Sequence, residues 1–228
     1  MPLDHEIFGE GVYTPREAAR LIGCSPADIR RWTRGSGTTD ALWNGYFQEL
    51  DDAAEINFAD LIELRTVFAL RKVTSLQAIR FAYDLAKEMF DTDRPFLELD
   101  FKTDGGEILV KGAENDENLT SLSKKRPTQR AFGKLIEQSL EDLEYEGKKV
   151  IRWRPAHAKQ VVIDPVRSFG TPVLDEFGIS TRTLYDEYAL FGEIGYLTSI
   201  YEIPKEAVKE AIQYEKKLDE GLNGQSSL

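Results

Sequence analysis

One short stretch near the start of the chain constrains the fold most, because two helix starts follow each other closely in it. The segment Thr14–Glu17 reads Thr-Pro-Arg-Glu, which is typical of a capped first turn with proline at the first helical position. The segment Ser25–Asp28 reads Ser-Pro-Ala-Asp and repeats the pattern. Gly23 between them suits a sharp turn. The stretch therefore predicts two short helices joined by a tight turn.

The apolar residues of this stretch have the spacing found in helix-turn-helix proteins. Ala19 is small enough to let the two helices approach, and Ile29 and Trp32 lie on one face of the second helix. Four residues of the second helix are then expected to face solvent: Ala27, Arg30, Arg31 and Arg34. A helical hairpin on the protein surface, with no ligand, would share most of these features and stays open as the alternative.

The overall charge limits how such a helix pair could bind nucleic acid. The 228 residues carry a net charge of -11, so DNA binding cannot depend on the field of the whole molecule. From Tyr13 to Gly35, however, there are five arginines against Glu17 and Asp28. A local basic face is therefore predicted, and the candidate DNA-contacting residues on it are Arg16, Ser25, Ala27, Arg30, Arg31 and Arg34.

A hairpin signal follows the second helix. Asn44-Gly45 stands between the apolar pairs Leu42-Trp43 and Tyr46-Phe47, and this is the strongest short-range cue for a two-residue turn. A small hairpin at this place would make the unit a winged helix. Its tip, Asn44, Gly45 and Tyr46, could then contact phosphate or the minor groove, although the hairpin could also simply cover the helices.

The rest of the chain predicts a mainly α fold with small β-hairpins. Helices are expected at 58–71 and, after a cap at Ser75, from 76 to at least 89, followed by strands at 97–101 and 107–111 around the turn 103–106. After a polar stretch, we expect a helix at 128–144, a strand that contains 150, 151 and 153, two short extended pieces at 161–165 and 169–174, and helices that begin at 181 or 183, near 194 and at 204. The expected organisation is a DNA-binding domain at 1–112, a linker at 113–127, a second helical domain at 128–220, and a flexible tail at 221–228.

The last two helices resemble a second helix-turn-helix, but their outer face differs from the first one. Lys205, Glu206, Lys209, Glu210 and Gln213 form a charge-balanced surface. A balanced surface gains little from phosphate, so a protein partner is the better prediction for this face.

The sequence offers few groups for chemistry. The two histidines, His5 and His157, have no neighbours at the spacing of metal ligands, and no glycine loop for phosphate is present. We therefore expect no enzyme activity, no cofactor and no metal site. The single Cys24 excludes an internal disulfide framework, and no apolar run is long enough to cross a bilayer. These features predict a cytoplasmic protein without membrane contact.

Three blocks of the sequence resemble one known family. Tyr13–Trp32 with the expected wing is similar to MerR-like winged helix-turn-helix domains. The segments 58–71, 79–82, 94–96 and 103–106 resemble the DNA-binding half of VapB-like antitoxins that carry such a head. Ile163-Asp164-Pro165, the segment 169–173 and the segment 201–208 resemble the small C-terminal domain of the same antitoxins. Each block is weak alone, and their order along the chain makes the combination more specific.

The resemblance implies a type II antitoxin that neutralises a PIN-domain ribonuclease and represses its own operator, as a homodimer or a larger complex. It assigns partner binding to the C-terminal domain, where the candidate residues are Lys205, Lys209, Gln213, Lys216 and Lys217. One departure matters: many such antitoxins inhibit through a basic residue in a disordered tail, and 219–228 contains none. Inhibition would then come from the folded domain, the linker or Lys216-Lys217.

Two other hypotheses stay open from the sequence. The chain could be a stand-alone MerR-like regulator whose C-terminal half binds an effector among Trp153, Phe169 and Tyr185. It could also be a scaffold that holds a protein partner and never contacts DNA.

Overall fold

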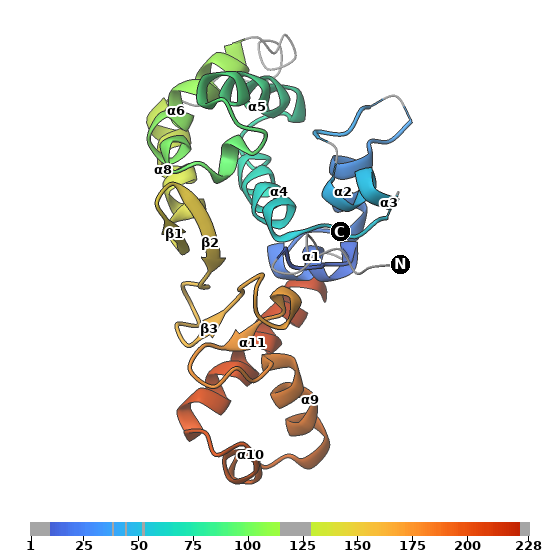
Figure 1. Ribbon diagram of the computed structural model, residues 1–228, viewed down its shortest axis with the longest axis vertical. Helices are drawn as coiled ribbons and strands as arrows, with labels where there is room; N and C mark the ends of the chain where they lie inside the picture. Colours follow the sequence, from blue (N-terminus) through green and yellow to red (C-terminus); the bar gives the residue numbers. More distant parts are fainter. Residues whose placement is uncertain (1–9, 38, 44, 52, 115–128, 224–228) are drawn as a thin grey trace.

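The computed structural model describes residues 10–37, 39–43, 45–51, 53–114 and 129–223 (Figure 1). This part of the chain is mostly helical and contains two small antiparallel sheets of two strands each, which confirms the mainly α fold with small β-hairpins. The helices of its first part are α1 (Pro15–Ile22), α2 (Pro26–Arg34), α3 (Tyr46–Asp51), α4 (Phe58–Leu70), α5 (Leu76–Phe90), α6 (Leu99–Glu114) and α8 (Gln129–Leu140), with a 3-10 turn, η1, at Pro95–Leu97.

Helix α4 is the central helix of this first part. Asn57 caps it by accepting the backbone N–H of Asp60, and the Asp60 side chain reaches back to the Asn57 N–H in a capping box. Residues on all sides of α4 are buried, whereas the sequence pattern suggested a helix with one solvent face. A helix buried all round is expected where neighbours cover each face, and α1, α8 and η1 all contact α4.

The predicted strands at 97–101 and 107–111 are wrong, because this segment is the single helix α6. The residues that were interpreted as alternating also fit a helical period, and those that α6 buries are Phe101, Gly105, Gly106, Ile108, Leu109, Gly112 and Ala113. The Gly105-Gly106 pair lies inside the helix. A Cβ on Gly105 would stand 2.8 Å from Ile136, and one on Gly106 would stand 2.9 Å from the Gln129 carbonyl oxygen. The glycines therefore allow α8 to pack closely on α6 instead of forming a turn.

Gly112 serves the same purpose on the side of α6 that faces α5. A Cβ at this position would lie 2.6 Å from the Ala78 backbone oxygen. We expect Gly112→Ala to lower the free energy of unfolding by about 1–3 kcal/mol through overpacking. Gly133→Ala is the matched control in α8, because a Cβ there meets nothing within 4 Å, and we expect it to be stabilising by up to about 1 kcal/mol. Urea denaturation of both variants checks this, and equal effects would contradict it.

The hydrophobic clusters divide the chain at a different place from the predicted domain boundary. One cluster runs from Tyr13 to Ile163 and includes Phe132 and Ile136 of α8, and the other holds residues from Ala158 onward. Helix α8, which was predicted to open the second domain, packs against α4 and α6 of the first. The first two residues of the predicted linker at 113–127 belong to α6, and the rest lie outside the described residues.

Two small hairpins connect the upper helices to the lower part of the molecule in Figure 1. Strands β1 (Leu143–Glu146) and β2 (Lys149–Trp153) pair antiparallel, as do β3 (Val161–Val162) and β4 (Val173–Leu174). The predicted helix at 128–144 thus ends earlier, at Leu140. A bridge between Trp153 and Ile163 joins the two hairpins. A 3-10 turn, η2 (Ser168–Gly170), precedes β4.

The lower part ends in three helices at the expected places: α9 (Thr181–Phe191), α10 (Ile194–Tyr201) and α11 (Lys205–Asn223). The apolar stripe predicted for the last helix is confirmed, because Ala207, Val208, Ala211 and Tyr214 are all buried. Helix α11 continues through residue 223, so the predicted tail at 221–228 begins inside it, and 224–228 lie outside the described residues. The last turns of α11 contact α1, which joins the two parts of the molecule.

Candidate nucleic-acid interface

Helices α1 and α2 start as the sequence predicts. The Thr14 hydroxyl accepts the Glu17 backbone N–H, and the Glu17 carboxylate accepts the Thr14 N–H, which completes a capping box. Ser25 accepts the Asp28 backbone N–H at the start of α2. Gly23 ends α1 in the left-handed region, at a φ of 81°, where a residue without a Cβ has no steric penalty. The tight turn between the helices is therefore fixed on both sides.

The inward and outward faces of α2 are also as expected. Ala19 and Ile29 are fully buried and Trp32 is nearly so, which explains why the two helices pack closely. The residues predicted to face solvent are exposed, namely Ala27, Arg30, Arg31 and Arg34. Arg16 on α1 is exposed as well, and Ser25 is half-buried in its capping role.

The three α2 arginines differ in the hydrogen bonds and ion pairs that their guanidinium groups already form within the chain. Arg31 Nη2 lies 2.5 Å from Asp28 Oδ1, and Arg34 Nη2 donates to the Ala53 carbonyl oxygen at 2.8 Å. Arg30 forms no hydrogen bond or ion pair with any residue that the structure describes. Arg30 is therefore the cation of α2 whose guanidinium has the fewest competing partners for a ligand.

One arginine of the basic count does not belong to this surface. Arg20 Nη2 lies 2.6 Å from a Glu215 carboxylate oxygen and 2.7 Å from Asp219, both on α11. Glu215 is fully buried and also accepts a hydrogen bond from the Thr181 hydroxyl. Arg20 consequently ties α1 to α11, and the positive surplus of the helix pair is smaller than the sequence suggested.

The predicted wing hairpin at 42–47 is wrong. Tyr46 and Phe47 begin the short helix α3 instead of a strand, Gly45 is buried in front of it, and Asn44 lies outside the described residues. The backbone N–H of Leu42 donates to the Trp32 carbonyl, which returns the chain to the end of α2. A tight turn does occur earlier, where Ser36 and Thr39 exchange both of their backbone hydrogen bonds. Gly45 and Tyr46, the two described residues of the predicted wing tip, are thus not on an exposed hairpin tip.

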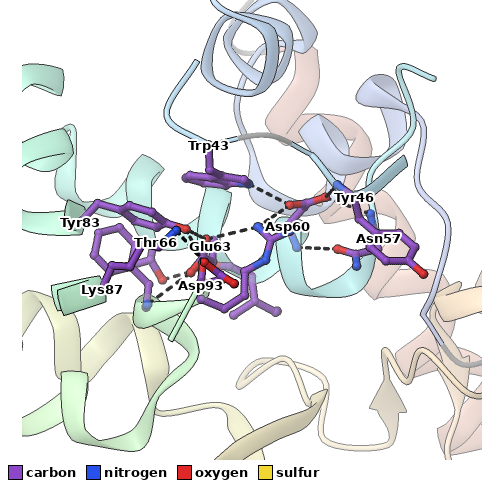
Figure 2. A network of polar contacts seen from close by, with 12 residues as sticks. Trp43, Tyr46, Asn57, Asp60, Glu63, Thr66, Tyr83, Lys87 and Asp93 are labelled. Atoms are coloured by element: carbon purple, nitrogen blue, oxygen red, sulfur yellow. Dashed lines mark hydrogen bonds and ion pairs between the residues drawn. The ribbon is translucent and has the colours of Figure 1, made fainter. Parts of the chain in front are cut away.

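Asp60 explains why this segment folds inward. One of its carboxylate oxygens accepts the Trp43 indole N–H at 2.8 Å, and the other accepts the Tyr46 backbone N–H at 3.2 Å (Figure 2). The Trp43 ring also stacks on Tyr83 of α5 at 5.2 Å between centroids. These tertiary contacts outweigh the local turn preference of Asn-Gly, because a buried carboxylate needs each of its donors.

A second buried carboxylate shares a single cation with Asp60. Arg94 Nη1 lies 2.6 Å from Asp60 and 3.5 Å from Glu63, and both carboxylates are fully buried. Tyr83 has one hydroxyl proton for two acceptors, Glu63 at 3.0 Å and the Asp93 carbonyl oxygen at 2.8 Å. A protonated Glu63 can donate to the Tyr83 oxygen and free the Tyr83 proton for Asp93. Burial, only partly opposed by Arg94, raises the pKa of Glu63 to about 8.

This raised pKa gives a pH dependence of stability. Between about pH 5 and 8 the folded chain keeps Glu63 protonated while the unfolded carboxyl is ionised, so the free energy of unfolding should fall as pH rises, by up to about 1.4 kcal/mol per unit. His157 acts in the opposite direction, because burial and the nearby Lys217 lower its pKa. Urea denaturation of the wild type and of Glu63→Gln at about pH 5, 6.5 and 8 checks this. Equal pH dependence in both proteins would contradict it.

The sequence pattern did not predict this network. A signal was present, since Asp60 and Glu63 are acidic residues three positions apart in a mostly apolar helix. Such carboxylates need a cation, but Arg94 lies far along the sequence, and no local pattern identifies it.

The predicted partner-binding residues lie together on the solvent face of α11. Lys205, Lys209, Gln213, Lys216 and Lys217 are all exposed. Among them, Lys216 lies over the Tyr188 ring of α9, 5.7 Å from its centroid. Nothing in this arrangement distinguishes the α11 face from an ordinary solvated helix surface.

Two observations on the described residues concern metal binding and thiol chemistry. No group of three or more histidine, cysteine or acidic residues among the described residues could hold a metal ion. Cys24 is buried, and its burial raises the pKa of the thiol to about 12, which keeps it protonated. None of the described helices combines the length and apolar character that a bilayer span requires.

Comparisons with known proteins inform the fold alone. No protein-family model matches the sequence, and no curated protein matches it either. The fold is similar to the crystal structure of Rv2018 from Mycobacterium tuberculosis, with a TM-score of 0.68 and 21% sequence identity. The similarity covers 90% of this chain and 99% of that chain, so both share essentially the whole architecture.

Proposed function

We propose that this chain is an antitoxin that represses its own operon through α2 and neutralises a PIN-domain ribonuclease through its C-terminal part. The observation that carries the DNA-binding half is the pair α1–α2, where Ile29 and Trp32 are buried while Arg30, Arg31 and Arg34 are exposed. The chain has a net charge of -11, but the three arginines on one side of α2 form a local surface of positive charge.

Helix α2 has the character needed for the major groove. Its exposed arginines can pair with guanine through two parallel hydrogen bonds or hold phosphates. Arg30 is the leading candidate for the base contact because it has no competing partner among the described residues. One such helix binds weakly, so we expect a dimer that reads two half-sites one helical turn apart.

The antitoxin half depends on the resemblance of the C-terminal blocks to VapB-like proteins. The residues of those blocks are folded: Ile163, in the first cluster, joins the two hairpins, and Ile203, Ala207 and Val208 are buried in the second cluster. A folded unit of this kind supports inhibition by a protein surface rather than by a tail, in line with the absence of basic residues in 219–228.

The effector-binding alternative has less support. Trp153 is buried in the first cluster, where its indole N–H donates to Asp142 at 2.8 Å. Tyr185 packs against the second cluster, and Phe169 is 60% exposed. Trp153 and Tyr185 thus belong to different hydrophobic clusters, and the Phe169 side chain lies mostly in solvent.

Co-expression with the product of the adjacent gene tests the proposal. We expect the two proteins to co-purify as a stable complex, and we expect the neighbour's product to be toxic and to degrade RNA only when this chain is absent. A neighbour that is harmless when expressed alone, together with no complex on size-exclusion chromatography, would overturn the antitoxin assignment.

A further inference from the structure

The lower end of the molecule carries large apolar side chains that the fold leaves uncovered. Leu190 is 78% exposed and Phe191 54% exposed at the end of α9, and Tyr196 is 40% and Ile200 56% exposed on α10. We refer to these four residues as the α9–α10 patch. Contiguous apolar surface of this kind on an otherwise charged protein marks an interaction site more often than chance exposure does.

Three of the four side chains, Phe191, Tyr196 and Ile200, form one surface, and Leu190 directly precedes Phe191 at the end of α9. The Phe191 and Tyr196 rings are in contact, with centroids 4.8 Å apart, across the turn at Gly192. Tyr196 and Ile200 are four residues apart on α10 and therefore share a helix face. The inward side of the same two helices is already filled by Leu184 and Leu197, both fully buried. The side chains of the patch therefore do not contribute to the hydrophobic core of this part of the chain.

The segment that carries the patch contains charges of one sign. From residue 183 to residue 204 there are four carboxylates and no lysine or arginine. Asp186 pairs with Arg182 at 2.9 Å, and Glu187 accepts the Tyr201 hydroxyl. Glu193 and Glu202 form no ion pair with any residue of the described chain, and they are the N-cap and C-cap of α10. Two uncompensated carboxylates therefore bracket the apolar face of α10.

Glu202 is held at this place against its backbone preference. Its φ is 54° and its ψ 38°, in the left-handed region where glycine is favoured at a helix end. A glycine would end α10 without steric cost, but it would remove the carboxylate. A Glu202→Gly substitution therefore removes the carboxylate without straining the backbone, and it can test the role of the charge alone.

We infer that the α9–α10 patch is the docking surface for the protein partner, and that the partner presents an apolar ridge flanked by lysine or arginine. The two cations should be about 14 Å apart, because Glu193 and Glu202 are nine residues apart at the two ends of α10 and a helix rises about 1.5 Å per residue. A second copy that presents the same patch does not fit, because the segment 183–204 of that copy would add carboxylates and no lysine or arginine. The inference rests on the proposed function and moves the predicted contact from the α11 face to α9 and α10.

The location of the patch agrees with a protein that has two ligands. Figure 1 shows α10 at the lower end of the molecule and α2 in its upper half. A partner on α10 therefore leaves the arginines of α2 accessible to DNA.

Binding of the purified full-length chain to the product of the adjacent gene, measured by isothermal titration calorimetry, tests the inference. We expect Leu190→Ser with Ile200→Ser to weaken binding at least 100-fold, because both side chains are more than half exposed and can change without disturbing the core. The matched control is Val166→Ser with Met89→Ser, two residues exposed elsewhere at 72% and 51%, which should bind within about threefold of the wild type.

A second pair of variants tests the charges. Glu193→Gln with Glu202→Gly should weaken binding about tenfold at low salt and reduce its salt dependence, while the melting temperature stays equal or rises. Glu137→Gln with Glu88→Gln removes two exposed carboxylates from α8 and α5 and should leave the affinity unchanged.

The outcomes separate the claims. If the wild type does not bind the neighbour's product, the proposed function fails and this inference fails with it. If the wild type binds but the patch variants bind equally well, only the inference is wrong. The α11 face is then the contact if Lys209→Glu with Lys216→Glu abolishes binding. If sedimentation velocity of the chain alone shows a dimer that the patch variants dissociate, the patch holds a second copy, and the inference is also overturned.

Discussion

Replacing Arg94 with leucine is expected to lower the free energy of unfolding by about 3–5 kcal/mol, because the change leaves buried carboxylates without their cation. Asp60, with no exposed surface, lies 2.6 Å from Arg94 and also holds Trp43 and Tyr46 in place. Glu63 is protonated near neutral pH, so the loss of the Arg94 cation destabilises it less than it destabilises Asp60. Most of the effect should therefore come from Asp60, and thermal and urea denaturation measure it.

Two further variants distinguish the loss of a cation from the loss of packing. Arg80→Leu removes a half-buried arginine whose one hydrogen bond to a described residue goes to the Asp40 carbonyl oxygen, and it should cost about 1 kcal/mol. Adding Asp60→Asn to Arg94→Leu should recover part of the stability, because no unpaired charge then remains in the interior. The claim that the buried Asp60 carboxylate requires Arg94 would be contradicted if Arg94→Leu lowered the free energy of unfolding by less than about 1 kcal/mol, or if the double variant recovered no stability.

Substitution of the exposed arginines of α2 should have the largest effect on DNA binding. We expect Arg30→Ala and Arg31→Ala each to cost about 1–3 kcal/mol of operator affinity, with a change of base preference for the residue that contacts a base. Arg31 must first leave Asp28, which lies 2.5 Å away, so Arg30→Ala should have the greater effect. Fluorescence anisotropy with operator variants measures both quantities.

Two controls accompany this prediction. One keeps the positive charge at position 30, and the other removes one arginine from a different part of the surface. Arg30→Lys retains the charge but not the paired hydrogen bonds, so it should lose base preference while keeping most of the nonspecific affinity. Arg130→Ala removes one exposed arginine from α8, which Figure 1 shows on the opposite side of the first part from α2, and should change the affinity little. Unchanged affinity in both Arg30→Ala and Arg31→Ala would remove the recognition-helix assignment.

The sequence predicted correctly the starts of those helices that are capped by a side chain of the same segment. Thr14, Ser25 and Ser75 accept backbone N–H groups three positions later, so the sequence alone identifies these starts. The same reasoning failed at Asn44-Gly45 and at Thr103–Gly106. In both places a turn signal is overridden by contacts with residues far along the chain: Asp60 holds Trp43 and Tyr46, and α8 packs on the α6 glycines.

The candidate interface was predictable to a similar extent. The exposure of Arg30, Arg31 and Arg34 follows from helical periodicity, because Ile29 and Trp32 must face inward. The removal of Arg20 from the surface could not be predicted, since its partners Glu215 and Asp219 are almost two hundred residues away. The α9–α10 patch escaped notice for another reason: apolar residues in a sequence are assigned to a core by default, and only the fold shows which ones the core does not use.

The central claim is that an acidic protein binds duplex DNA through the arginines of α2, and a salt titration tests it most directly. The purified chain is titrated into a labelled duplex from upstream of its own coding sequence, between about 50 and 200 mM salt. We predict a saturable complex whose affinity falls with a log–log slope of about -3.6, which corresponds to two phosphate contacts from each of two α2 helices. The absence of any salt-sensitive complex, even with the adjacent gene's product added, would contradict the account.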